Sequence, residues 1–281
     1  MALVTTGAML DEAYEGGYAV AAFNCENMEM VQAVIEAAAE MRSPVIVQTT
    51  PGTLEYATPS MFAAIARGAA KDHGFPVAMH LDHGKDRDMA VRALAAGYTS
   101  VMVDGSALPL ADNMAVTREV AEVCGAAGIP VEGELGRIGG KEDGEVGGDG
   151  YTDPDEAAAF VKGTGVTSLA IGIGTSHGVY AREPVLKISL VPRIREKVRI
   201  PMVLHGASGL SEADIKACIA GGIAKVNFAT ELRIAYTKAV RKFLAGDAKC
   251  IDPKKFGKAA RKAVREVAAE KMAICGCAGR C

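Results

Sequence analysis

Short runs of apolar, largely β-branched residues alternate along the chain with longer alanine-rich stretches whose apolar positions repeat every three to four residues. The first pattern is typical of strands buried on both faces, and the second of amphipathic helices. The alternation predicts strands at 18–23, 45–49, 77–81, 100–103, 130–134, 168–173, 202–205 and 224–228. Helices are predicted between and after them at 29–41, 60–71, 87–96, 113–126, 155–162, 187–197, 212–220 and 231–244.

Glycine and proline mark the points where one element gives way to the next. Gly97 and Gly221 follow predicted helix ends, and four of the predicted strands begin at or directly after a proline. Eight strands, each followed by a helix, predict an α/β fold, the (β/α)8 TIM barrel, with an open doubly wound sheet as the alternative. No change of composition divides the chain. We therefore expect one domain over residues 1–281, with an extra C-terminal helix and tail at 253–281.

Composition narrows the class of protein. The chain has 281 residues, of which 49% are hydrophobic, and its net charge is -3. So much apolar material excludes disordered and disulfide-scaffold classes, and the balanced charge argues against a nucleic-acid or membrane-surface partner. The first residues have no basic leader pattern, and no run of about 18 apolar residues occurs. We expect a cytoplasmic location.

The seven cysteines support the same compartment. Four of them are scattered singly along the chain, a pattern that predicts reduced thiols and no disulfide framework. The tail, with Cys275, Cys277 and Cys281, has two interpretations: a loose chain end, or a site for a soft metal.

Residues 136–150 interrupt the alternation, with seven glycines in fifteen positions. The segment follows the fifth predicted strand, on the side where barrel enzymes have their active sites. We predict a mobile loop that acts as a lid carrying a catalytic group; the alternative is a plain surface loop.

Four of the five histidines lie in or just beyond the carboxyl ends of predicted strands. They are His80, His83, His177 and His205. A single strand histidine is more often structural, but several at one rim of a barrel indicate a metal site. Three of them, His83, His177 and His205, would leave a fourth ligand position open, which is typical of catalytic zinc.

Carboxylates fall at the same rim. Asp82 precedes His83, and Asp104 ends the fourth strand, where it is either a site residue or a turn residue. Of Glu132 and Glu134 in the fifth strand, we expect one to point into the barrel mouth. Lys225 is not expected to take part in chemistry at this rim, since it is predicted at the start of its strand, away from the rim.

Small residues follow the last two strands, at 205–209 (His-Gly-Ala-Ser-Gly) and 227–230 (Asn-Phe-Ala-Thr). Such loops let backbone N–H groups approach an anion, and the following helix N-terminus adds its dipole. Barrel enzymes often bind phosphate at this place, so the two segments predict a phosphate site.

Motifs along nearly the whole chain carry a family resemblance. Residues 80–84 read His-Leu-Asp-His-Gly, and residues 174–178 read Gly-Thr-Ser-His-Gly. Further matching segments lie at 18–24, 43–46, 100–106, 131–136, 139–143, 204–209 and 225–230. In this combination and order they resemble the class II, metal-dependent ketose-1,6-bisphosphate aldolases, and within them the tagatose-bisphosphate branch most.

The resemblance implies a catalytic machinery. It implies one Zn²⁺ per subunit on His83, His177 and His205, with an alternative metal position at Asp104 and Glu134. Asp82 would exchange a proton with the aldehyde-side oxygen. Glu142, inside the glycine-rich loop, would handle the C3 proton.

The resemblance also implies a substrate site and partners. A monovalent cation, Na⁺ or K⁺, often accompanies the triose phosphate in this family, and a homodimer or homotetramer is expected. The second phosphate would lie near Arg233, with Thr50 as a further substrate contact. Triose-phosphate contacts would fall on Gly178, Gly206, Ala207, Ser208, Asn227, Phe228, Ala229 and Thr230.

The implied reaction is cleavage of tagatose or fructose 1,6-bisphosphate to dihydroxyacetone phosphate and glyceraldehyde 3-phosphate. A metal stabilises the enediolate formed by C3–C4 cleavage; the rival is a lysine Schiff base, but residues 168–174 contain no lysine. Ala229 resembles tagatose-type members, because fructose enzymes often have a polar residue there. Alternatives are the aldolase of inositol breakdown, a non-catalytic accessory barrel, and, more weakly, a zinc hydrolase. A partnership of this chain with an accessory subunit is a further alternative.

Overall fold

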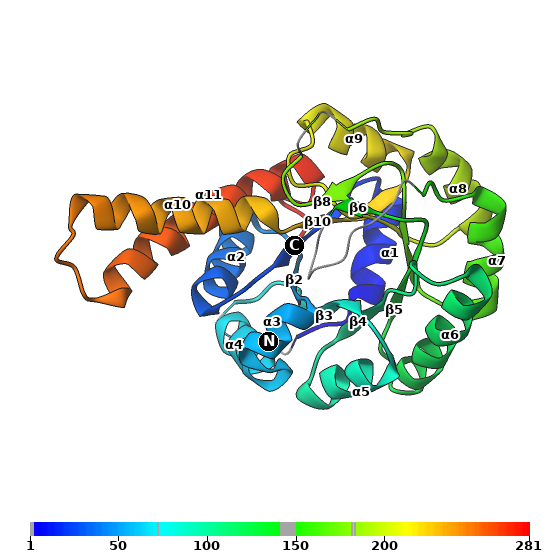
Figure 1. Cartoon of the computed structure of the whole chain (residues 1–281), viewed down its shortest axis with the longest axis horizontal. Helices are drawn as coiled ribbons and strands as arrows, with labels where there is room; N and C mark the ends of the chain where they lie inside the picture. The colour runs from blue at the N-terminus through cyan, green and yellow to red at the C-terminus, as the bar shows by residue number, and fades with distance from the viewer. Residues whose placement is uncertain (1–2, 72, 141–149, 181, 183) are drawn as a thin grey trace.

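The computed structural model describes residues 3–71, 73–140, 150–180, 182 and 184–281. Eight parallel strands close into a barrel in the order β1-β10-β9-β7-β5-β4-β3-β2, so the predicted (β/α)8 fold is confirmed (Figure 1). The open-sheet alternative is wrong, because β1 pairs with both β2 and β10. The strands are β1 (Val20–Asn24), β2 (Val45–Thr49), β3 (Val77–Gly84), β4 (Ser100–Val103), β5 (Val131–Leu135), β7 (Ser168–Ile171), β9 (Met202–Leu204) and β10 (Ile223–Phe228).

Helices surround the barrel, and most match the predicted ranges within a few residues. They are α2 (Met28–Met41), α4 (Pro59–Ala70), α5 (Arg87–Ala96), α6 (Leu110–Ala126), α7 (Pro154–Thr164), α8 (Leu190–Val198), α9 (Glu212–Gly221), α10 (Thr230–Gly246) and α11 (Pro253–Cys275). Local signals explain the boundaries: Asn27, Asp86 and Ser211 accept hydrogen bonds from first-turn N–H groups of α2, α5 and α9. Searched over the described residues, none of the helices is long and apolar enough to cross a membrane.

Two helices were not predicted. α1 (Thr6–Gly16) buries Thr6, Met9, Leu10 and Ala13, which form one helical stripe. It covers the amino ends of the strands, because Thr6 Oγ1 donates to Ser100 Oγ at the start of β4. The second, α3 (Pro51–Ala57), is a seven-residue helix that begins at a proline directly after β2. α3 is too short for a clear helical period.

The inside of the barrel is unusually polar. One apolar cluster, of Met102, Ala170 and Val203, lies apart from the main core between strands and helices. Residues two apart in a strand point to the same face, and several inward positions hold buried polar side chains. They are His80 and Asp82 on β3, Glu132 and Glu134 on β5, and Lys225 and Asn227 on β10.

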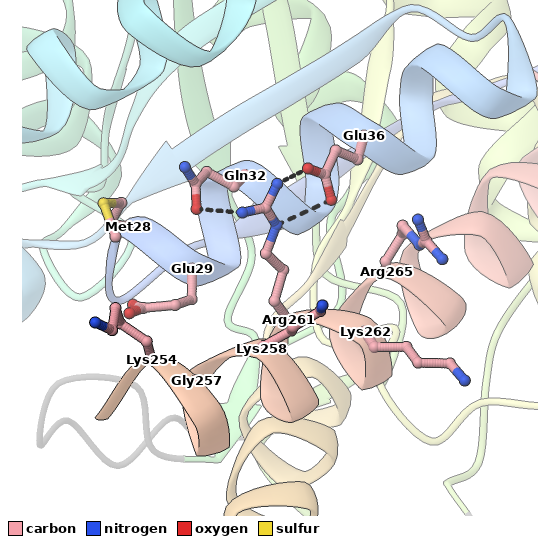
Figure 2. A pocket seen from close by; sticks show the side chains of 10 residues that line it. All are labelled: Met28, Glu29, Gln32, Glu36, Lys254, Gly257, Lys258, Arg261, Lys262 and Arg265. Carbon is pink, nitrogen blue, oxygen red and sulfur yellow. Dashed lines mark hydrogen bonds and ion pairs between the residues drawn. The ribbon is translucent and has the colours of Figure 1, made fainter. Parts of the chain in front are cut away.

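The helices α10 and α11 form an arm that extends beyond the barrel, and α11 returns to pack along α2 (Figure 1). A groove of about 500 Å³ separates α2 from α11, and Figure 2 shows Arg261 reaching across it to Gln32 and Glu36. The Arg261 guanidinium donates Nε to Glu36 at 3.0 Å and a terminal nitrogen to Gln32 at 2.9 Å. Arg265 pairs with Glu40 at 3.0 Å.

The cysteines form no disulfide, as predicted. Cys275 and Cys277 are buried, and burial raises the pKa of each thiol. Within the part of the chain that the structure describes, they do not form a group that could hold a metal. Their role is packing of the tail against the barrel, and the soft-metal interpretation is not supported.

Replacement of Arg261 by methionine should loosen the arm. The variant loses a forked ion pair that is only about one third exposed (35% for Arg261), so we expect the free energy of unfolding to fall by about 1 kcal/mol. Urea titration followed by circular dichroism measures this change. The control is Lys262→Met, because Lys262 lies 3.9 Å from Glu266 and is 70% exposed. Equal destabilisation by the two variants would contradict the bracing role of Arg261.

Candidate active site

Three histidines converge at the carboxyl end of the barrel. His83 is the residue before the last of β3, His205 directly follows β9, and His177 lies on β8 (Ser176–His177). The ring centroids are 4.8 Å apart for His83 and His205, and 4.9 Å apart for His83 and His177. One ring nitrogen from each lies within 4.8 Å of the others. The structure thus brings together the three histidines predicted to share a site.

His177 is held by a small sheet of its own. β8 pairs with β6 (Gly139–Gly140), which opposes Gly140 to His177. The Tyr180 hydroxyl accepts from the Ser176 N–H at 2.8 Å and donates to the Gly206 carbonyl at 2.7 Å. Gly206 has a φ of 65°, and a Cβ there would lie 2.6 Å from the Ser176 carbonyl oxygen. Only glycine therefore allows the loops that carry His177 and His205 to approach.

His83 has a left-handed backbone, with φ of 51°. This conformation is uncommon for residues with a side chain and is often found at functional sites. The next residue, Gly84, also lies close to other backbone, since a Cβ there would be 2.5 Å from the Met102 carbonyl oxygen. The end of β3 is thus shaped to direct the His83 ring across the barrel mouth.

Two carboxylates set the orientation of these rings. Asp104 Oδ2 lies 2.9 Å from His83 Nδ1, and Glu132 Oε1 lies 2.9 Å from His205 Nε2. Because carboxylates only accept hydrogen bonds, the protons belong on these two nitrogens. The opposite nitrogens, His83 Nε2 and His205 Nδ1, then face each other at 3.2 Å, a distance that needs a proton or another cation between them. Such a contact fits a cation held between the two rings.

The electrostatics agree with a cation site. Burial lowers the pKa of His83, but the Asp82 charge and the Asp104 hydrogen bond outweigh it and raise this pKa well above its usual value. Burial, together with the charge on His83 and His205, lowers the pKa of His177 well below its usual value. Zinc or a similar divalent metal binds neutral imidazoles, so it would replace the proton that the raised pKa keeps on His83.

A second group, which also includes His83, could hold a metal. His83, Asp104 and Glu134 also bring one ligand atom each within 4.8 Å of the others. Glu134 Oε2 is buried without a hydrogen-bond partner, and burial, then the neighbouring Asp104, raises the pKa of Glu134 well above its usual value. An unpaired buried carboxylate of this kind is suited to a cation. The residues predicted as an alternative metal position thus lie together.

Asp82 lies beside the histidines, almost fully buried at 1% exposure. Its carboxylate accepts from Asn24 at 2.8 Å and from Asn227 at 3.2 Å, and Gln48 donates to Asn24 at 2.8 Å. Burial raises the pKa of Asp82, but positive charge on His83, His205 and Lys225 outweighs it and lowers this pKa. The group is therefore an oriented anion that can accept a proton.

Sequence reasoning did not assign site roles to Asn24 and Gln48. Both are buried amides at or next to the ends of two mostly apolar strands, β1 and β2. A polar residue at the last inward position of an apolar strand was the signal for each. Their roles depend on Asp82, which lies 58 positions after Asn24, so only the fold brings the three together.

The interior below the histidines corrects one expectation. Lys225 lies below the rim, where its Nζ is fully buried and 2.8 Å from Glu132 Oε2. Glu132 and Glu134 both face inward, because residues two apart in a strand share a face. His80 Nδ1 lies 2.8 Å from Ser100 Oγ, and burial, reinforced by Lys225, lowers the pKa of His80 to about 3.

The predicted phosphate residues come together at the next two loops. Gly206, Ala207 and Ser208 follow β9, and the Ala229 N–H donates to Ser208 Oγ at 3.3 Å. α10 begins at Thr230 without a side-chain cap, so its first N–H groups are suited to an anion. Gly178, Asn227 and Phe228 belong to the same rim. The Phe228 ring stacks on Phe23, with centroids 5.7 Å apart, so Phe228 is a packing residue.

Thr50 and Arg233 are joined by an acidic residue that the sequence did not single out. Arg233 donates Nε to Glu26 at 2.7 Å, and the other Glu26 oxygen accepts from Thr53 at 2.6 Å. Thr50 lies 3.3 Å from Thr53 between hydroxyl oxygens. Arg233 is 40% exposed, so its outer face can still meet a ligand.

Glu142, the predicted lid residue, lies outside the described residues, as do all of 141–149. On either side of this gap, the Arg137 N–H donates to the Gly150 carbonyl at 2.8 Å, and the two residues form an isolated antiparallel bridge. The ends of the segment are thus fixed next to β5.

Comparisons with known proteins agree on a family. The family model for class-II fructose-bisphosphate aldolases matches residues 4–280. The solved YdjI aldolase from Escherichia coli K12 is 37% identical, with a TM-score of 0.88 over 99% of each chain. A proposed fructose-1,6-bisphosphate aldolase from Coccidioides immitis is 32% identical, with a TM-score of 0.89 over 97% of this chain and 96% of that one. Fructose-bisphosphate aldolase from Campylobacter jejuni, 22% identical with a TM-score of 0.86 over 100% of this chain and 97% of that one, shares the fold.

Substitution of His83 by alanine should abolish tight metal binding. Because it removes a ligand itself, we expect zinc affinity to fall by more than the ~10–100-fold typical of a lost outer hydrogen bond. Competition with a chelating dye measures the affinity. His73→Ala is the matched control, since His73 lies outside both groups that can hold a metal. Unchanged affinity in the His83 variant would rule out this site.

Proposed function

Because the chain belongs to the class-II fructose-bisphosphate aldolase family, whose members are lyases, we propose that it catalyses the metal-dependent, reversible aldol cleavage of a ketohexose 1,6-bisphosphate. Tagatose and fructose 1,6-bisphosphate are the candidate substrates, and dihydroxyacetone phosphate and glyceraldehyde 3-phosphate the products. The observation that carries the proposal is the convergence of three imidazoles beside the oriented carboxylate of Asp82. Carbon–carbon cleavage at C3–C4 needs both an electrophile and a base.

His83, His177 and His205 would hold one Zn²⁺ per subunit, with Asp104 and Glu134 as ligands for an alternative position. When bound, the metal supplies Lewis acidity toward the oxygen at C2 of the ketose, where negative charge develops. The protein's part is to orient the histidines, which the two carboxylate hydrogen bonds do by holding a proton on the ring nitrogen that faces away from the metal position.

Asp82 would take the proton of the C4 hydroxyl group during cleavage and return it during condensation. Its lowered pKa means that it is ionised near neutral pH, and its amide partners Asn24 and Asn227 hold both oxygens in place. Burial keeps water away from the carboxylate. A base must be in reach and correctly protonated, and these contacts supply the second condition.

Glu142 would protonate the C3 carbanion after cleavage, which requires the glycine-rich loop to reach the site. The proposal rests on sequence resemblance alone, as this residue lies outside the described part of the chain. The anchored loop ends at Arg137 and Gly150, beside β5, support it.

The two phosphates would lie at opposite sides of the metal. The backbone N–H groups of 206–208 and the start of α10 would bind the triose phosphate, with Gly178 and 227–230 around it and a Na⁺ or K⁺ ion nearby. Arg233 and Thr50 would contact the second phosphate. Glu26 lowers the net charge there, so Arg233 would divide its donors between Glu26 and the phosphate.

Ala229 favours tagatose over fructose 1,6-bisphosphate, as it offers no polar side chain to a sugar hydroxyl. The two sugars differ only in configuration at C4, and an unmade hydrogen bond to a buried group costs about 1–3 kcal/mol. The Coccidioides immitis relative is named for fructose, which keeps that sugar a candidate. Arg233, as a proposed contact of the second phosphate, argues against the inositol-pathway aldolase, because the substrate of that enzyme lacks the second phosphate ester.

Self-association through the arm fits the charge distribution. Residues 233–265 contain eleven of the 31 basic side chains of the chain but only two of its 34 acidic ones. The arm is therefore strongly basic and the rest of the chain acidic, which favours contact with a second copy. We propose a homodimer or homotetramer on this ground.

Side-by-side assays of the two sugars test the proposed activity. We expect both to be cleaved after zinc addition, with tagatose 1,6-bisphosphate preferred by about tenfold or more in kcat/KM, as one lost hydrogen bond predicts. Chelation should abolish turnover and zinc should restore it. Equal cleavage of fructose 1,6-bisphosphate would refute only the preference. Absence of zinc-restored cleavage of either sugar would refute the activity.

Substitution of Asp82 by asparagine separates the base from the metal site. The amide has the same shape but cannot take a proton, so we expect kcat to fall by about 10²–10⁴-fold with little change in KM. Zinc content should stay at one per subunit by elemental analysis. A kcat close to wild type would show that Asp82 is not the base.

A further inference from the structure

The buried polar residues below the three histidines are not part of the proposed chemistry. Lys225 lies on β10 and Glu132 on β5, two strands that are not neighbours in the barrel. Their side chains meet inside it, with Lys225 Nζ 2.8 Å from Glu132 Oε2 at 0% and 1% exposure. A buried ion pair of this kind gives little net stability compared with apolar packing, so its presence calls for another explanation.

We propose that Lys225 and Glu132 are positioning residues that fix the proton of His205 on Nε2 and so leave Nδ1 free to bind the metal. The inference rests on the proposed function, since it concerns the same metal. It assigns to the lysine no contact with substrate.

The argument follows from which groups donate. An ammonium has only donors, so Lys225 takes one oxygen of Glu132, Oε2, at 2.8 Å. The other oxygen, Oε1, is 2.9 Å from His205 Nε2 and can only accept. The proton of His205 therefore stays on Nε2, and Nδ1 faces His83 Nε2. Asn227 Nδ2 lies 3.1 Å from the same Nε2 and donates to Asp82 Oδ1 at 3.2 Å.

His80 closes the other side of Glu132. Its Nδ1 is engaged with Ser100 Oγ, which also accepts from Thr6 Oγ1. Its Nε2 lies 3.8 Å from Glu132 Oε2 and has no hydrogen-bond partner. Among the residues that the structure describes, Lys225 is thus the lysine or arginine paired with Glu132, and it decides how this carboxylate is oriented.

Three variants test the arrangement. In Glu132→Gln, the Lys225 ammonium group still needs a hydrogen-bond acceptor. The amide oxygen of Gln should therefore turn toward the lysine, and its NH₂ group toward His205. His205 Nε2 must then accept, its proton moves to Nδ1, and zinc affinity should fall by ~10–100-fold. In Lys225→Met, the unpaired carboxylate should also weaken zinc binding, by about tenfold or more.

The double variant Glu132→Gln/Lys225→Met should bind zinc at least about fivefold more tightly than Glu132→Gln alone. Without the lysine, the amide can turn its oxygen to His205 and its NH₂ group to the unpartnered Nε2 of His80. Loss of a second charged residue would thus restore binding. A purely structural role predicts the opposite order, because the two defects would then add.

Two readouts are needed besides activity. Chelator competition on the full-length protein gives zinc affinity, and ¹⁵N NMR of histidine side chains in the metal-free protein reports the His205 tautomer. Lys271→Met is the control: this buried lysine pairs with Glu231 at 3.0 Å, outside both groups that can hold a metal. It should lower thermal stability and leave zinc affinity within twofold of wild type.

The outcomes separate this inference from the proposed function. Wild-type protein that binds no zinc overturns both. Zinc-dependent cleavage by wild type, combined with a double variant no better than Glu132→Gln or an unchanged His205 tautomer in Glu132→Gln, overturns the inference alone. Trapping of substrate on Lys225 by borohydride would also overturn it, because the lysine would then be a nucleophile.

Discussion

The site depends on one contact: His83 Nε2 and His205 Nδ1 face each other at 3.2 Å, with their protons held on the far side of each ring by Asp104 and Glu132. Two lone pairs at this distance would repel, so the contact needs a proton or another cation between the two nitrogens. The surrounding carboxylates, the buried ion pair and the left-handed backbone at His83 hold the two rings in this position. The geometry therefore suits a cation between the rings.

This arrangement has a cost inside the barrel. Positions that apolar side chains fill in an ordinary TIM barrel are occupied here by charged and amide groups, such as Lys225, Glu132 and Gln48. They are tolerated because most have hydrogen-bond partners, which removes most of the desolvation penalty. The stability of the molecule comes instead from the apolar layer between strands and helices.

Much of the fold could be predicted because strand and helix patterns are local. The eight strands and their order along the chain follow from apolar runs, whereas α3 was missed because seven residues show too little period. α1 was missed although its buried residues have helical spacing. The three histidines were found because strand ends identify a common rim. The contact of Lys225 with Glu132 was not predicted, since the two residues lie 93 positions apart in the sequence and meet across the barrel. The role of Glu26, which accepts a hydrogen bond from Arg233, was not predicted because these two residues are also far apart in the sequence.

Closure of the barrel also determines when the site can form during synthesis of the chain. β1 pairs with β10, and Val20 lies beside Lys225. A nascent chain that ends before β10 cannot form this pairing. His205, Asn227 and Lys225 all come late in the sequence, while Asp82 and His83 come early. Contacts between such distant positions form slowly and only once most of the chain is available. A metal held by the three histidines could therefore bind only late in biogenesis, after the last strand has closed the ring.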